Sequence, residues 1–150
     1  MSSTIHSLSD FLKNKSYFKI KMHAIASNHF KIISKINGVR GDFVLDTGAS
    51  FTFVDLNLES KFKLKSETSL IKASGAGPNK LTTLISKDNS IKIGGWNCKT
   101  FKIALIDLSN VNDAFESVEA PAVDGIIGAD ILKNGNAVID YEKKYLYLKY

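Results

Sequence analysis

The chain has 150 residues, of which 44% are hydrophobic and 23% charged. This size and composition are typical of one globular domain with its own core, and they exclude a disordered chain. No apolar run approaches the roughly 20 residues that a membrane-spanning helix needs, and residues 1–10 are too polar for a signal peptide. We therefore expect a cytoplasmic protein with no membrane partner. The single cysteine, Cys98, cannot form an internal disulfide, which fits a reducing compartment.

The net charge of +5 comes from 19 lysines and one arginine, Arg40, against 15 acids. Lysines alternate with apolar residues in 18–22 and 91–93, which is typical of the solvent face of a strand. The sequence has no cluster of basic and aromatic residues that would bind single-stranded nucleic acid. We therefore expect no nucleic-acid partner.

Apolar and polar residues alternate with a period of two along most of the chain, which predicts a mostly β protein. A short helix is expected first, because Ser7 to Asp10 reads as a capping box before Phe11 and Leu12. Strands are then expected around residues 18–22, 91–93, 101–105 and 146–148. The short connections between strands predict antiparallel hairpins.

Turn signals separate these strands. Asn37-Gly38 and Gly94-Gly95 supply the positive φ angles of tight hairpins, and residues 142–144 form a polar turn. The stretch 108–120 is expected to be a loop. A second short helix is predicted over residues 129–134, ended by Gly135 in a left-handed conformation.

The chemistry concentrates in Asp46-Thr47-Gly48-Ala49-Ser50, where an apolar strand runs into a polar turn with an acid at the junction. Taken alone, Asp-Thr-Gly is an ordinary strand-ending turn in which Asp46 bonds to its own backbone. Two apolar residues precede it, and Asp124-Gly125-Ile126-Ile127-Gly128 follows later in the chain. Over residues 28–150 this ordered set resembles the aspartic proteases of the retroviral type, the retropepsin-like family, and its single-lobe bacterial members.

The resemblance implies a mostly β fold, a single-lobe retropepsin-like barrel with a short C-terminal helix and an added N-terminal helix. We divide the chain accordingly into a helical extension, residues 1–16, and one protease domain, residues 17–150. The resemblance also implies a flap that closes over the substrate, with its tip at Ala73, Ser74, Gly75, Ala76 and Gly77. Ile126, Ile127 and Gly128 would form the supporting strand.

The family's chemistry implies an aspartic endopeptidase in which Asp46 activates water at mildly acidic pH, with no cofactor and no metal. Two facing carboxylates share one proton in this mechanism, and the chain contains one Asp-Thr-Gly. One chain would supply half of an active site, so a homodimer acting on a protein or peptide substrate is required. By the resemblance, Thr47 would bond across the two-fold axis, Gly48 would let the backbone approach the carboxylates, and Ala49 and Ser50 would complete the turn. Ser50 would also orient Asp46.

Two departures from the retroviral pattern affect the flap and the dimer. The flap tip lacks the usual Ile-Gly-Gly, and Ala129 stands where retroviral enzymes carry an arginine. Asp130 instead matches the bacterial Gly-x-Asp pattern, and we expect it to cap the following helix. The three histidines have no metal-like spacing.

The alternative function is a catalytically weak or silent dimer of this fold that binds peptides.

Overall fold

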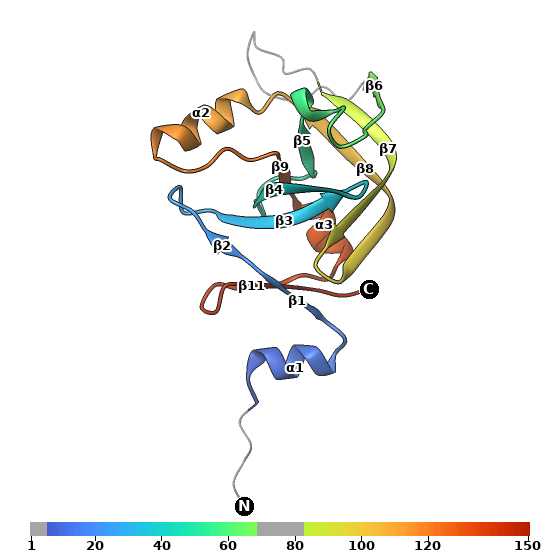
Figure 1. The fold of residues 1–150 in the computed structure, drawn as a ribbon. Coiled ribbons are helices and arrows are strands. Elements are labelled where there is room, and N and C mark those ends of the chain that lie inside the picture. Colours follow the sequence, from blue (N-terminus) through green and yellow to red (C-terminus); the bar gives the residue numbers. More distant parts are fainter. Residues whose placement is uncertain (1–5, 69–82) are drawn as a thin grey trace, which may run out of the picture.

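A computed structural model describes residues 6–68 and 83–150 (Figure 1). The elements in chain order are α1 (Leu8–Asn14), β1 (Phe18–Lys21), β2 (His23–Ala24), β3 (Phe30–Ile36), β4 (Val39–Leu45), β5 (Phe53–Asp55), the 3-10 helix η1 (Leu56–Leu58), β6 (Ser66–Thr68), β7 (Leu84–Ile93), β8 (Trp96–Ile106), α2 (Ser109–Ser117), β9 (Gly125–Ile127), α3 (Ala129–Asn134), β10 (Val138–Asp140) and β11 (Tyr145–Leu148). The prediction of a mostly β chain is confirmed.

The larger sheet closes into a barrel, because β3 pairs with β4 on one side and with β7 on the other. The strand order around the barrel is β3-β4-β9-β5-β8-β7. Apolar residues of the alternating pattern fill its interior, among them Ile32, Phe43, Ile91 and Ile103, which are completely buried. The barrel confirms the predicted retropepsin-like fold and fixes the strand ends that carry the site.

Two strand pairs in the barrel are parallel, which the expectation of antiparallel hairpins did not include. β4 runs parallel to β9, and β5 runs parallel to β8. Parallel neighbours require long crossover connections, and here residues 46–124 and 56–95 separate the paired strands. The parallel pairing brings the end of β4 beside the end of β9, although the two lie far apart in sequence.

A smaller antiparallel sheet, ordered β1-β11-β10, lies below the barrel in Figure 1. Leu146, Tyr147 and Leu148 in its central strand are all buried, so both faces of β11 are covered. Helix α1 extends beyond this sheet and begins as predicted, because the amide of Asp10 donates to Ser7 Oγ at 3.1 Å. Among the described residues, β1 and β10 are the free edges of this sheet, because each pairs with β11 alone.

The hairpin turn at Asn37-Gly38 is confirmed, because both residues have positive φ angles, 50° and 82°. The prediction for Gly135 is wrong: its φ is −90°, and Asn136 adopts the left-handed conformation with a φ of 47°. Glycine is needed at 135 for another reason, since an added Cβ would lie 2.7 Å from Leu148 Cδ2. Close packing against β11 therefore explains this glycine.

The expectation of a loop over residues 108–120 is also wrong, because Ser109–Ser117 forms helix α2. Its Phe115 packs into a second apolar cluster with Val44 and Ile126 on the outside of the barrel. The Ser109 hydroxyl and the Ser109 amide both donate to the Asp107 carboxylate. These hydrogen bonds lower the pKa of Asp107, and the bond from the hydroxyl has the larger effect. Tertiary contacts fix this helix.

Within residues 6–68 and 83–150, no helix combines the length and the apolar character that crossing a membrane requires. The cytoplasmic location stays a prediction. In the same ranges, no three His, Cys, Asp or Glu side chains gather as a metal site would require.

Candidate active site

Asp46 lies where β4 leaves the barrel. The ladder between β4 and β9 pairs Leu45 with Ile127, and the Asp46 amide continues it by donating to the Ile127 carbonyl at 3.0 Å. The chain then turns sharply, because the Ala49 amide donates to the Asp46 carbonyl at 3.2 Å. The barrel wall therefore fixes the backbone of Asp46, while its side chain projects from the end of the strand.

The carboxylate of Asp46 is held by the turn that follows it. The Gly48 amide donates to Asp46 Oδ1 at 2.9 Å, whereas no bond links the Ser50 hydroxyl, which was expected to orient Asp46, to this carboxylate. Asp46 is half-buried, and Thr47, Gly48 and Ser50 are exposed. A carboxylate with one oxygen bonded and one side open to the surface is able to exchange protons with a bound water.

A buried threonine that the sequence analysis did not single out connects this turn to α3. Thr52 is completely buried, and its hydroxyl donates to Asp130 Oδ1 at 2.7 Å while accepting from the Gly128 amide at 3.1 Å. The Thr52 amide donates to the other oxygen, Asp130 Oδ2, at 2.9 Å. Buried polar groups that are fully paired in this way hold two segments in one arrangement.

The prediction that Asp130 caps α3 is wrong, because Gly128 is the N-cap residue, no side chain caps this helix, and Asp130 lies inside its first turn. Its Oδ1 accepts from the amide of Ile131, in the first turn of α3, at 2.8 Å, and its two oxygens also bind Thr52. Asp130 thus joins α3 to the segment that follows the Asp-Thr-Gly turn. A hydroxyl spaced six residues after Asp46 was the available sequence signal for Thr52, but nothing local distinguishes it from other buried threonines.

Gly128 follows β9, which was predicted as the supporting strand, and it passes very close to the turn. An added Cβ at Gly128 would lie 2.4 Å from the Phe51 carbonyl oxygen and 2.7 Å from that of Ala49. The next amide, Ala129, donates to the Ala49 carbonyl at 2.7 Å. Only a residue without a side chain allows this approach of Gly128, while Ile126 and Ile127 pair with β4 in the strand that leads to it. Their role as a supporting strand of an active site stays a prediction.

Asp124, the acid of the second motif, lies at the other end of β9 from Asp46 because β4 and β9 run in parallel. Its carboxylate accepts from the Asp42 amide at 2.8 Å and faces Lys61 at 3.6 Å. Asp124 therefore fastens the start of β9 to β4 and takes no part in the Asp46 environment.

Two hollows flank the exposed Thr47, and Ile139 of β10 lines both. The first, of about 150 Å³, is lined by Asn28, His29, Phe30, Leu45, Asp46, Thr47, Ile139 and Tyr141. The second is a wider groove between Thr47 and residues of α3 and β10. Asp46 is the one acid among the described residues that line the first hollow, so the described part of the chain contributes a single carboxylate there.

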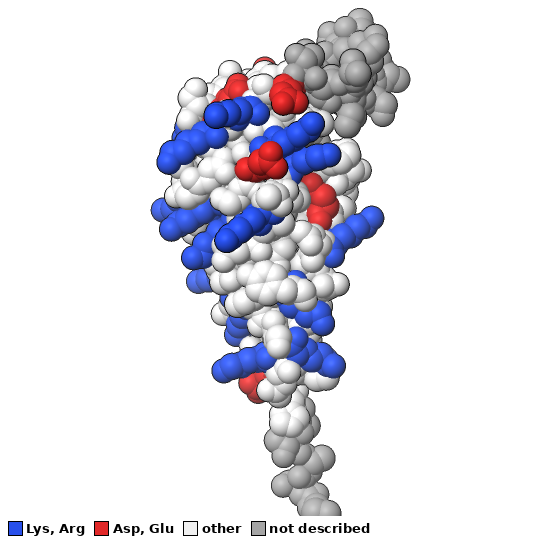
Figure 2. All heavy atoms as spheres, turned by 90° about the vertical axis from the view of Figure 1, so that its right-hand side faces the viewer, with Lys and Arg blue, Asp and Glu red and all other residues white. Residues whose placement is uncertain are grey.

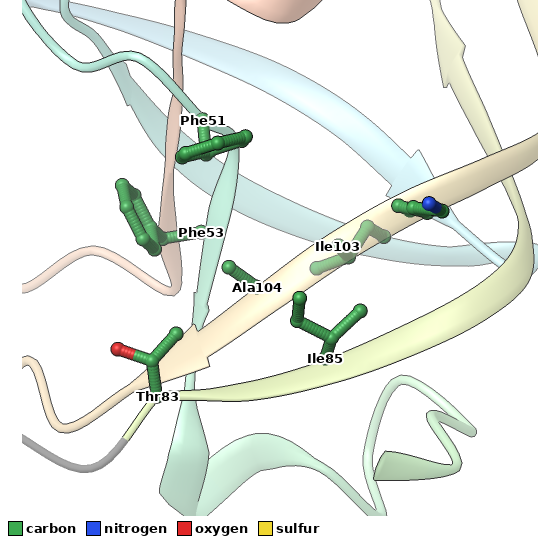
Figure 3. A pocket seen from close by; sticks show the side chains of 7 residues that line it. Phe51, Phe53, Thr83, Ile85, Ile103 and Ala104 are labelled. Atoms are coloured by element: carbon green, nitrogen blue, oxygen red, sulfur yellow. The ribbon is translucent and has the colours of Figure 1, made fainter. Parts of the chain in front are cut away.

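A third pocket, of about 190 Å³, lies beyond the turn and is almost entirely apolar (Figure 3). Phe51 and Phe53 form one wall, and Ile85, Ile103 and Ala104 face them from β7 and β8. The Thr83 hydroxyl, also on the lining, is buried without a hydrogen-bond partner in the described residues. Such a pocket fits an apolar side chain of a ligand that reaches the turn.

The predicted flap tip, residues 73–77, lies outside the described residues. The other predicted site residues, 46–50 and 126–128, are described, and the structure brings them together.

Comparison with protein-family models identifies this arrangement. A model described as "Aspartyl protease" matches residues 32–131, which is more than half of the chain. The chain belongs to the aspartyl protease family. The matched segment includes the Asp46 turn, the strand at 126–128 and Asp130. No curated protein matches the sequence of this aspartyl protease family member significantly.

Solved structures place the chain in the retropepsin-like branch of the family. A retropepsin-like aspartic protease from Rickettsia conorii is 25% identical, with a TM-score of 0.56 over 89% of this chain and 90% of that one. The retroviral protease-like domain of Ddi1 from Leishmania major is 17% identical, with a TM-score of 0.55 over 79% of this chain and 86% of that one. The EIAV protease complexed with the inhibitor HBY-793 is 23% identical, with a TM-score of 0.50 over 69% and 84%. The last two likenesses concern the fold alone.

Proposed function

We propose that this family member is an aspartic endopeptidase whose active site forms between two copies of the chain. The observation that carries the proposal is the half-buried Asp46 carboxylate, bonded on one oxygen by the Gly48 amide at the end of the barrel beside β9. A carboxylate needed only for the turn could be replaced by asparagine, which forms the same bond to an amide. The ionisable group is what catalysis requires.

The chemistry needs one carboxylate with a proton and one without. The ionised Asp46 of one copy takes a proton from water, whose oxygen attacks the peptide carbonyl carbon, while the protonated Asp46 of the other copy donates to the carbonyl oxygen. The tetrahedral intermediate then collapses as the C–N bond breaks: the amine leaves with the proton that the first Asp46 took from water, and the proton on the former carbonyl oxygen returns to the second Asp46. Two carboxylates in contact share a single proton readily, because ionising both is unfavourable.

The surface around Thr47 supports a homodimer. Strand β10 is a free edge of the smaller sheet, its three residues are half-buried, and Ile139 adjoins Thr47 in both hollows. A free strand edge presents unpaired amide and carbonyl groups that a second copy can bind. An isologous contact of β10 with its symmetry mate would pair the strands antiparallel and bring the two Asp46 turns together.

The substrate would be an extended peptide under the flap at residues 73–77. The apolar pocket in Figure 3 lies next to the turn, since Phe51 directly follows Ser50. We expect it to favour a large apolar side chain near the scissile bond, because an apolar cavity of about 150 Å³ already holds a benzene ring.

The test compares the wild type with Asp46→Asn on a diverse peptide library from pH 4 to 7, with molecular mass measured in parallel. We expect the wild type to cleave as a dimer and Asp46→Asn to lose activity by about a thousandfold or more while remaining dimeric, because asparagine cannot transfer the proton. Equal cleavage by both proteins, or cleavage by a strict monomer, would refute the mechanism. Peptide binding by both proteins without turnover would favour the silent peptide-binding dimer.

A further inference from the structure

Three basic side chains lie side by side across three neighbouring strands on the outside of the barrel. The strand register places Lys35 of β3 directly opposite Arg40 of β4, and the same Lys35 directly opposite Lys92 of β7. All three residues are exposed. Residues directly opposite in antiparallel strands project from the same face, so these cations form one row, which we call the basic row.

No acid compensates the basic row. None of its three residues forms an ion pair with a described acid. The nearest acid on this face of β4 is Asp42, two residues from Arg40, and Asp42 already faces Lys31 at 3.8 Å. Figure 2, which shows the side of the molecule where β7 lies, carries far more basic than acidic side chains. The row therefore stands in a region of net positive charge.

Like charges directly opposite each other destabilise a sheet. Any polar residue would serve on a solvated face, as Asn97 does on β8 opposite Lys92. The alternation of lysines with apolar residues along one strand explains why each lysine is exposed. It does not explain why three basic side chains lie directly opposite one another on three neighbouring strands. Arg40, the single arginine of the chain, occupies one end of the row, and its planar group is suited to bind a carboxylate through two hydrogen bonds.

We propose that the basic row is a docking site for an acidic segment of the protein substrate, an inference that rests on the proposed protease function. Neighbouring strands lie about 4.8 Å apart, so the row is about 10 Å long and matches two or three carboxylates of an extended peptide. Arg40 lies in β4 and Asp46 directly follows this strand six residues later, a separation of about 20 Å along the strand direction. The acidic segment would therefore lie at least six residues from the scissile bond.

A polypeptide fits the row better than a nucleic acid or a lipid surface does. The exposed large apolar residues of the described chain are Leu8, Phe11, Phe51, Val118, Tyr141 and Tyr150. None belongs to β3, β4 or β7, so these strands carry no exposed aromatic side chain to stack on a base and no exposed large apolar side chain to enter a membrane. Carboxylates need only the charges and the hydrogen-bond donors that the row provides.

The first test uses a peptide that the wild type cleaves, extended beyond six residues by either Glu-Glu-Glu or Gln-Gln-Gln. The variant replaces Lys35, Arg40 and Lys92 with Gln, and the matched control replaces the exposed Lys13, Lys21 and Lys143 with Gln. We expect the Glu extension to lower KM about tenfold at low salt without changing kcat, because exposed ion pairs between the three cations and the carboxylates add only modestly to binding. The advantage should disappear in the row variant, persist in the control and shrink at high salt.

The second test measures binding without catalysis, in the Asp46→Asn background, with a fluorescent Glu-rich peptide. Binding that is lost in the row variant and kept in the control supports the proposal, even if no peptide is ever cleaved and the protease function itself fails. Equal binding by the row and control variants would overturn it. Tighter binding of a single-stranded oligonucleotide or of phosphatidylserine vesicles than of the peptide at the same salt would overturn it in favour of those partners.

Discussion

At the scale of single residues, the position of Asp46 depends on hydrogen bonds between residues that it does not contact. Its own turn supplies one hydrogen bond, from the Gly48 amide. The position of that turn against α3 is set by the Thr52 hydroxyl, which binds Asp130 and Gly128 at once. Because this hydroxyl and Gly128 are buried, the Gly128 amide is left without a partner if the hydroxyl is removed.

The substitution Thr52→Val keeps the shape of the side chain and removes both hydrogen bonds. We expect the free energy of unfolding to fall by about 1–3 kcal/mol, because Asp130 loses a donor and the Gly128 amide loses its acceptor. Urea denaturation measures the loss, and kcat/KM should fall with it. Thr52→Ser, which restores the hydroxyl, is the control: if it behaves like Thr52→Val, the hydrogen bonds are not the cause.

At the scale of elements, β7 and β8 build the apolar pocket, and β10 forms the exposed edge near Thr47. The segment 108–120, predicted as a loop, contains helix α2, whose Phe115 packs with Val44.

Ala104→Leu would fill the pocket from β8, since the Ala104 side chain faces it (Figure 3). We expect kcat/KM to fall about tenfold or more for peptides with a large apolar side chain near the scissile bond, because that side chain loses its buried site. Peptides with a small side chain at that position serve as the control and should keep their rates. An equal loss for both peptides would indicate a folding defect, which thermal unfolding would reveal.

Single cysteines at Val138, Ile139 and Asp140, each in a Cys98→Ser background, test the β10 edge. Residues opposite in antiparallel strands have Cα atoms about 4.5–5.5 Å apart, which suits a disulfide. We expect at least one variant to form a covalent dimer on mild oxidation, scored by non-reducing electrophoresis. Lys19→Cys on β1, the other free edge of the same sheet, is the control. Cross-linking through β1 alone would show that the second copy binds the opposite edge.

At the scale of the whole molecule, the proposed activity belongs to a pair of chains. The Asp46 hollow contains one acid among the described residues that line it, so the proposed mechanism takes its second carboxylate from another copy. The activity of the protein should therefore depend on which chains are paired.

Mixing wild type with a tenfold excess of Asp46→Asn tests this dependence. If the chains exchange, about ten in eleven wild-type chains pair with an inactive partner, and we expect activity to fall about tenfold. The control is the same excess of an unrelated protein. Unchanged activity after the chains are unfolded and refolded together would show that one chain is sufficient.

The sequence by itself determined the strand character, the Asn37-Gly38 hairpin and the position of Asp46 at the end of a strand. These features are local, because alternation, turn residues and an apolar run that ends in an acid act over a few residues. The family resemblance came from the order of motifs along the chain.

Only the tertiary structure decided which strands run in parallel, that residues 109–117 form a helix, and that Thr52 joins the Asp46 turn to α3. It also revealed the basic row, since the alignment of Lys35 with Arg40 and Lys92 is a property of strand register. Each of these features depends on residues that meet across the barrel, and their pairing is governed by the packing of the whole core rather than by local preference.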